Sequence, residues 1–188
     1  MGTSVNQRSP DTTNWKLVQQ AYENPDFPIE RALREVWRAA GNQEQGNLIE
    51  QLAEPTIGSL VSVAARSSSP ADASRAVGDY IADNLGASLA ADIATRAVIQ
   101  SAGRPDASSY FVQRLFAEAT DYLVSRDLPG HISPGSRLDS MSAARAFKQD
   151  MMRTTASTVQ QTPLPSSYDD SRWTTFVNTV VGAIRRRR

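Results

Sequence analysis

The most regular pattern of apolar and polar positions lies at the C-terminal end of the chain. Six large apolar residues recur there at spacings of 3, 1, 3, 1 and 3: Trp173, Phe176, Val177, Val180, Val181 and Ile184. This spacing places all six on one stripe of a helix and leaves polar residues on the other faces. Four arginines, Arg185, Arg186, Arg187 and Arg188, follow directly. We therefore predict an amphipathic helix with an arginine-rich end over residues 171–188.

Apolar stripes with helical spacing also recur between residues 12 and 128. The best defined follows Pro28 and consists of Ile29, Leu33, Val36, Trp37 and Ala40. Proline is favoured in the first turn of a helix, so this segment has both a start signal and a buried face. No segment alternates apolar and polar residues with period two, so no strand is expected. The fold class predicted is all-α, a compact bundle of about six or seven helices over residues 12–128, preceded by a disordered tail, residues 1–11.

Short polar residues, prolines and glycines mark the ends of these helices. Ser69 followed by Pro70 is a strong start signal, and Asp106 is expected to cap another helix. Asn42 with Gln45 resembles a capping box. Glycine after the last apolar position of a stripe, as at Gly103, indicates a helix C-terminus.

Residues 129–170 are expected to form a linker region with one probable helix over residues 138–152. Prolines and glycines open the region, and the helix is indicated by Met141, Ala144, Phe147 and Met151. From Thr154 onward the sequence is rich in Ser, Thr, Gln and Pro, a composition that favours an extended course. The C-terminal helix is therefore expected to be tethered to the bundle by a segment of more than a dozen residues.

Composition removes several classes of function. The chain has 20 basic and 20 acidic residues, so it has no strong overall attraction to nucleic acid or anionic lipid. It has no cysteine, which excludes disulfides, thiolate metal sites and cysteine nucleophiles. The N-terminal residues lack the apolar run of a secretory signal, and no apolar run approaches the roughly 20 residues that span a bilayer. We expect a cytoplasmic protein.

Catalytic and metal-binding patterns are not evident. His131 is the single histidine, in a turn-forming segment, and cannot by itself build a histidine-based metal site. Asp79 and Asp83 share one helical face, but they lack the Glu-x-x-His partners of a di-metal site. Trp37, by contrast, lies on an apolar stripe, where core packing is the expected role of an aromatic ring. We expect a protein that is not an enzyme and has no cofactor, metal or small-molecule substrate.

The C-terminal helix leaves three interpretations open. It can pack on the chain's own bundle, dock as a tethered helix on a partner, or use its arginines on nucleic acid or an anionic membrane. We favour docking: a non-enzymatic interaction or assembly module that binds a partner protein or a second subunit, with Arg185–Arg188 on nucleic acid or membrane as the alternative. The expected contact residues are the ten named at the start of this section, from Trp173 to Arg188. Trp15, near the other end of the chain, is a further candidate contact residue.

Overall fold

A computed structural model describes residues 12–40, 48–84 and 86–187, and helices are the only regular secondary structure in this part of the chain. The helices are α1 (Thr12–Glu23), α2 (Ile29–Ala40), α3 (Leu48–Leu52), α4 (Pro55–Arg66), α5 (Pro70–Asn84), α6 (Leu89–Ser101), α7 (Ala107–Asp127), the 3₁₀ helix η1 (Leu128–His131), α8 (Met141–Gln160) and α9 (Asp170–Arg186). The predicted all-α class is confirmed. The disordered tail proposed for residues 1–11 and the capping box at Asn42 and Gln45 lie outside the described residues.

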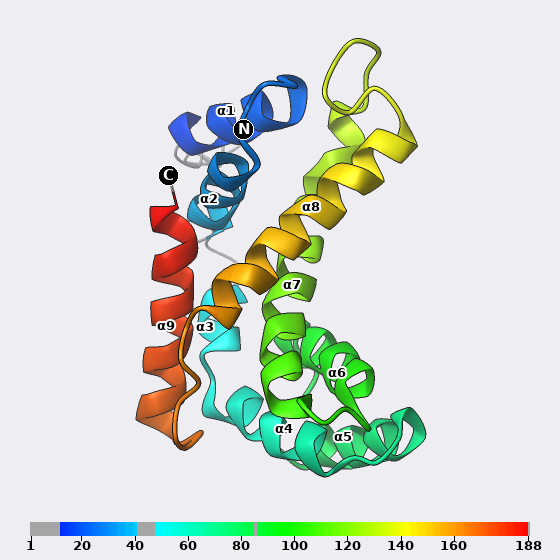
Figure 1. Ribbon diagram of the computed structural model, residues 1–188, viewed down its shortest axis with the longest axis vertical. Coiled ribbons are helices and arrows are strands. Elements are labelled where there is room, and N and C mark those ends of the chain that lie inside the picture. Colours follow the sequence, from blue (N-terminus) through cyan, green and yellow to red (C-terminus); the bar gives the residue numbers. More distant parts are fainter. Residues whose placement is uncertain (1–11, 41–47, 85, 188) are drawn as a thin grey trace, which may run out of the picture.

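Two long helices, α7 and α8, pack against each other and form the middle of the molecule (Figure 1). At one end of the molecule, α7 packs against α4 and α6, and α5 packs against the outer side of α4 and α6. At the other end, α1 lies on α2. Helix α9 runs along one edge of the molecule, and its C-terminal end lies beside α2 (Figure 1). Helices far apart in the sequence therefore meet in one bundle.

A continuous apolar core connects these helices. It includes the rings of Trp37, Phe111 and Phe116, all fully buried, which confirms the core role expected for Trp37. The core also contains a polar contact: the Trp37 indole nitrogen donates to Thr120 Oγ1 at 3.1 Å, and Thr120 Oγ1 lies 2.9 Å from Thr155 Oγ1. This contact ties α2, α7 and α8 together where they cross.

Most of the predicted helix ends are confirmed. The Ser69 hydroxyl accepts a hydrogen bond from the Asp72 amide at 3.2 Å, as a capping serine should. Gly103 follows α6 with φ of +75°, a conformation that disfavours any side chain. Asp106 stands at the N-cap position of α7 as expected, but its carboxylate makes no capping bond and instead accepts from Arg104 Nε at 3.0 Å.

The region after α7 contains more helix than its composition suggested. Helix α8 extends to Gln160, eight residues beyond the expected end. Thr155, Thr158 and Val159 are buried in this extension, although threonine had indicated a linker. Each threonine hydroxyl donates to the carbonyl four residues before it, Thr155 to Met151 and Thr158 to Thr154, both at 2.9 Å, so burial leaves no hydroxyl proton unbonded. The segment joining α8 to α9 is therefore only residues 161–169.

Candidate functional site

The apolar stripe of α9 is packed inside the bundle. Trp173, Val177, Val180 and Ile184 have no exposed surface, and Phe176 and Val181 are at most 5% exposed. They lie against the chain's own helices, because α9 packs on α2, α3, α4 and α8. The expectation that these six residues are left over for a partner is thus corrected: the stripe already has its apolar surface, and that surface belongs to the same chain.

Trp173 fixes the N-terminal half of α9. Its indole nitrogen donates to the carbonyl oxygen of Leu52 at 2.9 Å, and its ring stacks on that of Phe176 with centroids 5.6 Å apart. The same ring covers Gly58 of α4 so closely that a Cβ built there would lie 2.6 Å from the Trp173 ring. A hydrogen-bond acceptor, a stacked ring and a closely packed glycine together hold this ring in one position.

The start of α9 is fixed by a carboxylate. The Asp169 side chain accepts a hydrogen bond from the Arg172 amide at 3.1 Å, which is the geometry of an N-cap. The hydrogen bonds from the Ser167 hydroxyl and from the Arg172 amide lower the pKa of Asp169 below its ordinary value. Next to it, burial raises the pKa of the half-buried Tyr168 phenol.

At the other end of α9, arginines join the C-termini of two helices. The Arg185 guanidinium donates to the carbonyl oxygen of Trp37, in the last turn of α2, at 3.0 and 3.2 Å. In return, Arg38 of α2 donates to the Arg185 carbonyl at 3.3 Å, and Arg34 donates to the Arg187 carbonyl at 3.1 Å. Cationic side chains thus bond carbonyl groups at both helix ends and lie near both negative dipole ends.

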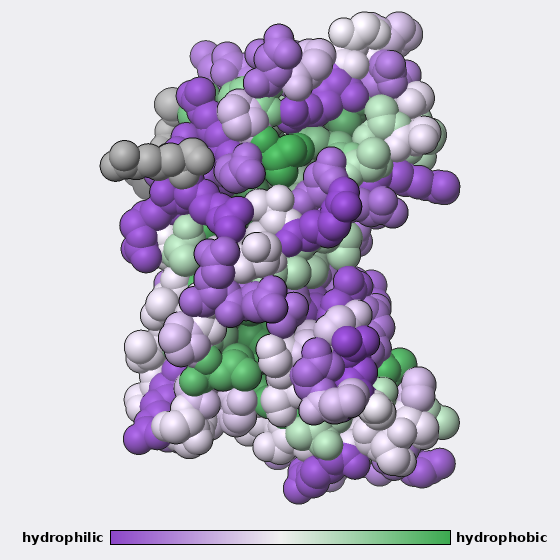
Figure 2. Space-filling model, in the orientation of Figure 1, coloured by the Kyte–Doolittle hydropathy of each residue, from purple (hydrophilic) through white to green (hydrophobic). Residues whose placement is uncertain are grey.

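We call these five residues, Arg34, Arg38, Arg185, Arg186 and Arg187, the arginine patch. In Figure 2 hydrophilic side chains cover the molecule where α9 meets α2. One buried carboxylate, Glu35, is paired with the patch: its Oε1 lies 2.8 Å from Arg34 Nε and 3.3 Å from an Arg38 nitrogen. Burial, and then the nearby positive charge of Arg38, lower the pKa of Arg185. The patch is strongly cationic in a chain with no net charge.

Sequence reasoning found the α9 half of this patch and missed the α2 half. Arg34 fits an i, i+4 pair with Glu30, a pattern typical of a solvated helix face. In the structure Arg34 pairs instead with Glu35 and reaches across to α9. No sequence signal marks this role, because it depends on a contact between residues 153 positions apart. Arg188 lies outside the described residues.

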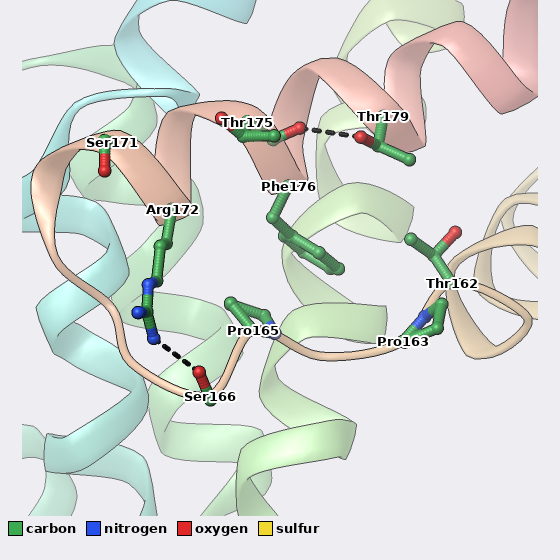
Figure 3. A pocket seen from close by; sticks show the side chains of 9 residues that line it. All are labelled: Thr162, Pro163, Pro165, Ser166, Ser171, Arg172, Thr175, Phe176 and Thr179. Atoms are coloured by element: carbon green, nitrogen blue, oxygen red, sulfur yellow. Dashed lines mark hydrogen bonds between the residues drawn. The ribbon is translucent and has the colours of Figure 1, made fainter.

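A groove of about 430 Å³ lies between α9 and the segment that precedes it (Figure 3). We call it the linker groove; it is lined by Thr162, Pro163, Pro165, Ser166, Ser171, Arg172, Thr175, Phe176 and Thr179. Figure 3 shows the Phe176 ring pointing from α9 toward Pro163 and Pro165, with Arg172 at one side bonded to Ser166. The groove has apolar walls formed by Phe176 and the two prolines and a rim of hydroxyl groups. Phe176 is thus a residue of the apolar stripe that also lines this groove.

A second cavity, of about 380 Å³, lies between α4 and α5. It brings Asp79 and Asp83 together with Asp72, all near Arg66. Within the described ranges, no three His, Asp or Glu side chains are placed to hold a metal ion. His131 is partly buried beside Tyr22, and its Nδ1 lies 3.7 Å from Glu23 Oε1, so its ring is held against α1.

No helix in the described part of the chain has the length and apolar character needed to cross a membrane. The side chain of Trp15 lies outside the described residues, so its proposed contact role stays a prediction. Comparison of the chain with protein-family models, with curated proteins and with solved structures gave no match.

Proposed function

We propose that this protein is a non-enzymatic helical interaction module that assembles with a second copy of itself through the linker groove. The observation that supports the proposal is the groove itself, which places two prolines and the nearly buried ring of Phe176 beside an open volume. The apolar stripe of α9 packs on the chain's own helices, so it is not available to a partner. The proposed contact surface is instead the side of α9 that faces the linker. This keeps the C-terminal helix at the interface but changes which of its residues take part.

A second copy is favoured as the occupant because the chain itself has an exposed apolar side chain, Leu164, next to the groove. Leu164 stands between the two groove prolines and is itself 37% exposed, and it does not line the groove. In a twofold dimer each surface patch meets the same patch of the other subunit. Leu164 of one subunit then enters the groove of the other, and the same contact is made twice. Both exposed Leu164 side chains leave water in this arrangement.

Sedimentation velocity over a range of protein concentrations tests the proposal. We expect a concentration-dependent dimer that is lost in Leu164→Ser, which removes the inserted side chain, and in Thr179→Arg, which fills the groove. Matched controls come from the same molecule. Met141→Ser removes the other strongly exposed large apolar side chain among the described residues, and Asn178→Arg adds the same charge at an exposed α9 position that does not line the groove.

Either of two results would overturn the proposal. One is a wild-type protein that stays monomeric at all concentrations. The other is a dimer that Asn178→Arg and Met141→Ser weaken as much as Thr179→Arg and Leu164→Ser do. Thermal unfolding of each variant shows that the fold is intact, because all four positions are at least partly exposed and surface substitutions usually change stability by about 0.5 kcal/mol or less.

A further inference from the structure

We propose that the arginine patch binds the phosphate backbone of double-stranded nucleic acid without preference for sequence. This inference does not rest on self-association. It rests on the guanidinium groups of Arg34, Arg38 and Arg185, which two helices bring together. Arg186 and Arg187 follow Arg185 directly in the chain, and the sequence alone showed only these contiguous arginines after Ile184. The partner is identified by its chemistry: closely spaced, singly charged anionic groups on a regular surface.

The arrangement of donors suits phosphate oxygens. Each guanidinium has five N–H donors, and the contacts with carbonyl groups and with Glu35 use about two of them in each of Arg34, Arg38 and Arg185. Those contacts fix the direction of each side chain, so less conformational entropy is lost when a phosphate binds. Arg38 and Arg186 are exposed, and Arg187 is partly exposed, so the donors that remain are accessible from solvent.

Burial of the α9 stripe favours nucleic acid over a membrane surface. An amphipathic helix that lies on a bilayer must place its apolar face among the lipid acyl chains. In α9 that face is covered, because Val180 and Ile184, the residues next to the arginines, have no exposed surface. The patch then attracts a partner by charge alone. Among anionic partners, a polyanion with closely spaced charges is attracted most strongly.

The same burial favours contact with the backbone over contact with bases. Trp37, Trp173 and Phe176 are the aromatic residues of α2 and α9, and all three are buried. No exposed ring on these helices can therefore stack on an unpaired base, which is the usual platform for single strands. A duplex, whose phosphates are continuous and whose bases are stacked on one another, fits the patch better.

Fluorescence anisotropy of the full-length protein with labelled DNA duplexes of two unrelated sequences tests the proposal. We expect equal affinities for the two duplexes. We also expect log affinity to fall with log salt with a slope of about −2 to −4 over roughly 50 to 200 mM, because two to four arginines can each reach a phosphate. Arg38→Gln combined with Arg186→Gln should make the slope shallower by about one for each arginine removed.

Arg75→Gln is the matched control, since Arg75 is an exposed helical arginine on α5. This helix packs on α4 and α6, at the end of the molecule away from the C-terminal end of α9 (Figure 1). It should leave both affinity and slope unchanged. The absence of duplex binding in low salt, or a double variant that binds as the wild type does, would overturn the proposal. Binding to vesicles of phosphatidylserine and phosphatidylcholine without binding to duplex DNA would also overturn it and assign the patch to a membrane.

Discussion

The indole ring of Trp173 lies directly over the α-carbon of Gly58, where α9 and α4 touch. The ring leaves no room for a side chain at position 58. A Cβ at Gly58 would lie 2.6 and 2.7 Å from two atoms of the ring. The ring cannot move aside easily, since it is fully buried and hydrogen bonded to the Leu52 carbonyl. A glycine in the middle of a helix is normally a cost, and here it allows the close approach of two helices.

Gly58→Ala should therefore destabilise the protein although alanine favours helix. Overpacking costs typically 1–3 kcal/mol, and the better helix propensity of alanine returns about 1 kcal/mol. We expect a net loss of up to about 2 kcal/mol in the free energy of unfolding, measured by urea denaturation. Gly78→Ala is the matched control, because Gly78 is an exposed helical glycine with nothing near its would-be Cβ. It should stabilise by about 0.5–1 kcal/mol, and equal effects of the two substitutions would contradict the packing.

The Phe176→Asp variant tests whether α9 is packed on the bundle in solution or is free. Phe176 contacts Trp173 and Phe116 in the core, so the substitution removes a buried ring and leaves an unpaired carboxylate in its place. The expected loss is more than about 3 kcal/mol in the free energy of unfolding, with Asn178→Asp, on the exposed side of the same helix, close to neutral. If the fold instead tolerates Phe176→Asp, α9 is not packed in solution, and the docking of a free helix on a partner becomes the better account.

Apolar periodicity was enough to predict the helices but not the surface that each one covers. The spacing from Trp173 to Ile184 determines which side of α9 is apolar, because the helical repeat is fixed by backbone geometry. It contains no information about the surface that covers this side, since the residues that α9 contacts, such as Leu52 and Trp37, lie more than a hundred residues away in sequence. The apolar side of α9 thus remained compatible with three functions until the fold was known.

Two local features of the sequence mark structural details that the predictions missed. Gly58 interrupts the apolar stripe of α4, and a glycine in that position often marks a close helix contact. Threonines at residues 155 and 158 continue the helical spacing of Phe147 and Met151, yet the polar composition around them indicated a linker. Composition misled here because a threonine hydroxyl can bond its own helix backbone and so lie on a buried face.

The contact between Trp37 and Thr120 predicts unequal effects for two similar substitutions. Thr120→Val removes the acceptor of the buried Trp37 N–H, and an unsatisfied buried donor costs about 1–3 kcal/mol. Thr155→Val leaves that bond in place, and the Thr120 hydroxyl can still donate to the Phe116 carbonyl. We expect Thr155→Val to cost clearly less than Thr120→Val in urea denaturation. An equal cost would mean that Trp37 does not depend on Thr120.

Asp169 should make the stability of the protein depend on pH in the acidic range. Hydrogen bonds from the Ser167 hydroxyl and the Arg172 amide favour the charged carboxylate, so the pKa of Asp169 in the folded protein is lower than in the unfolded chain. A depressed pKa contributes stability that is present above the unfolded pKa and is lost as the pH falls through the folded one. Asp169→Asn keeps an oxygen that can cap α9 but does not titrate. The wild type should therefore be the more stable of the two near about pH 7, and its advantage should decline below about pH 4, the ordinary range of an aspartate. Thermal unfolding of both proteins across this range measures the difference, and a difference that does not change with pH would show that the Asp169 charge plays no part in holding the start of α9.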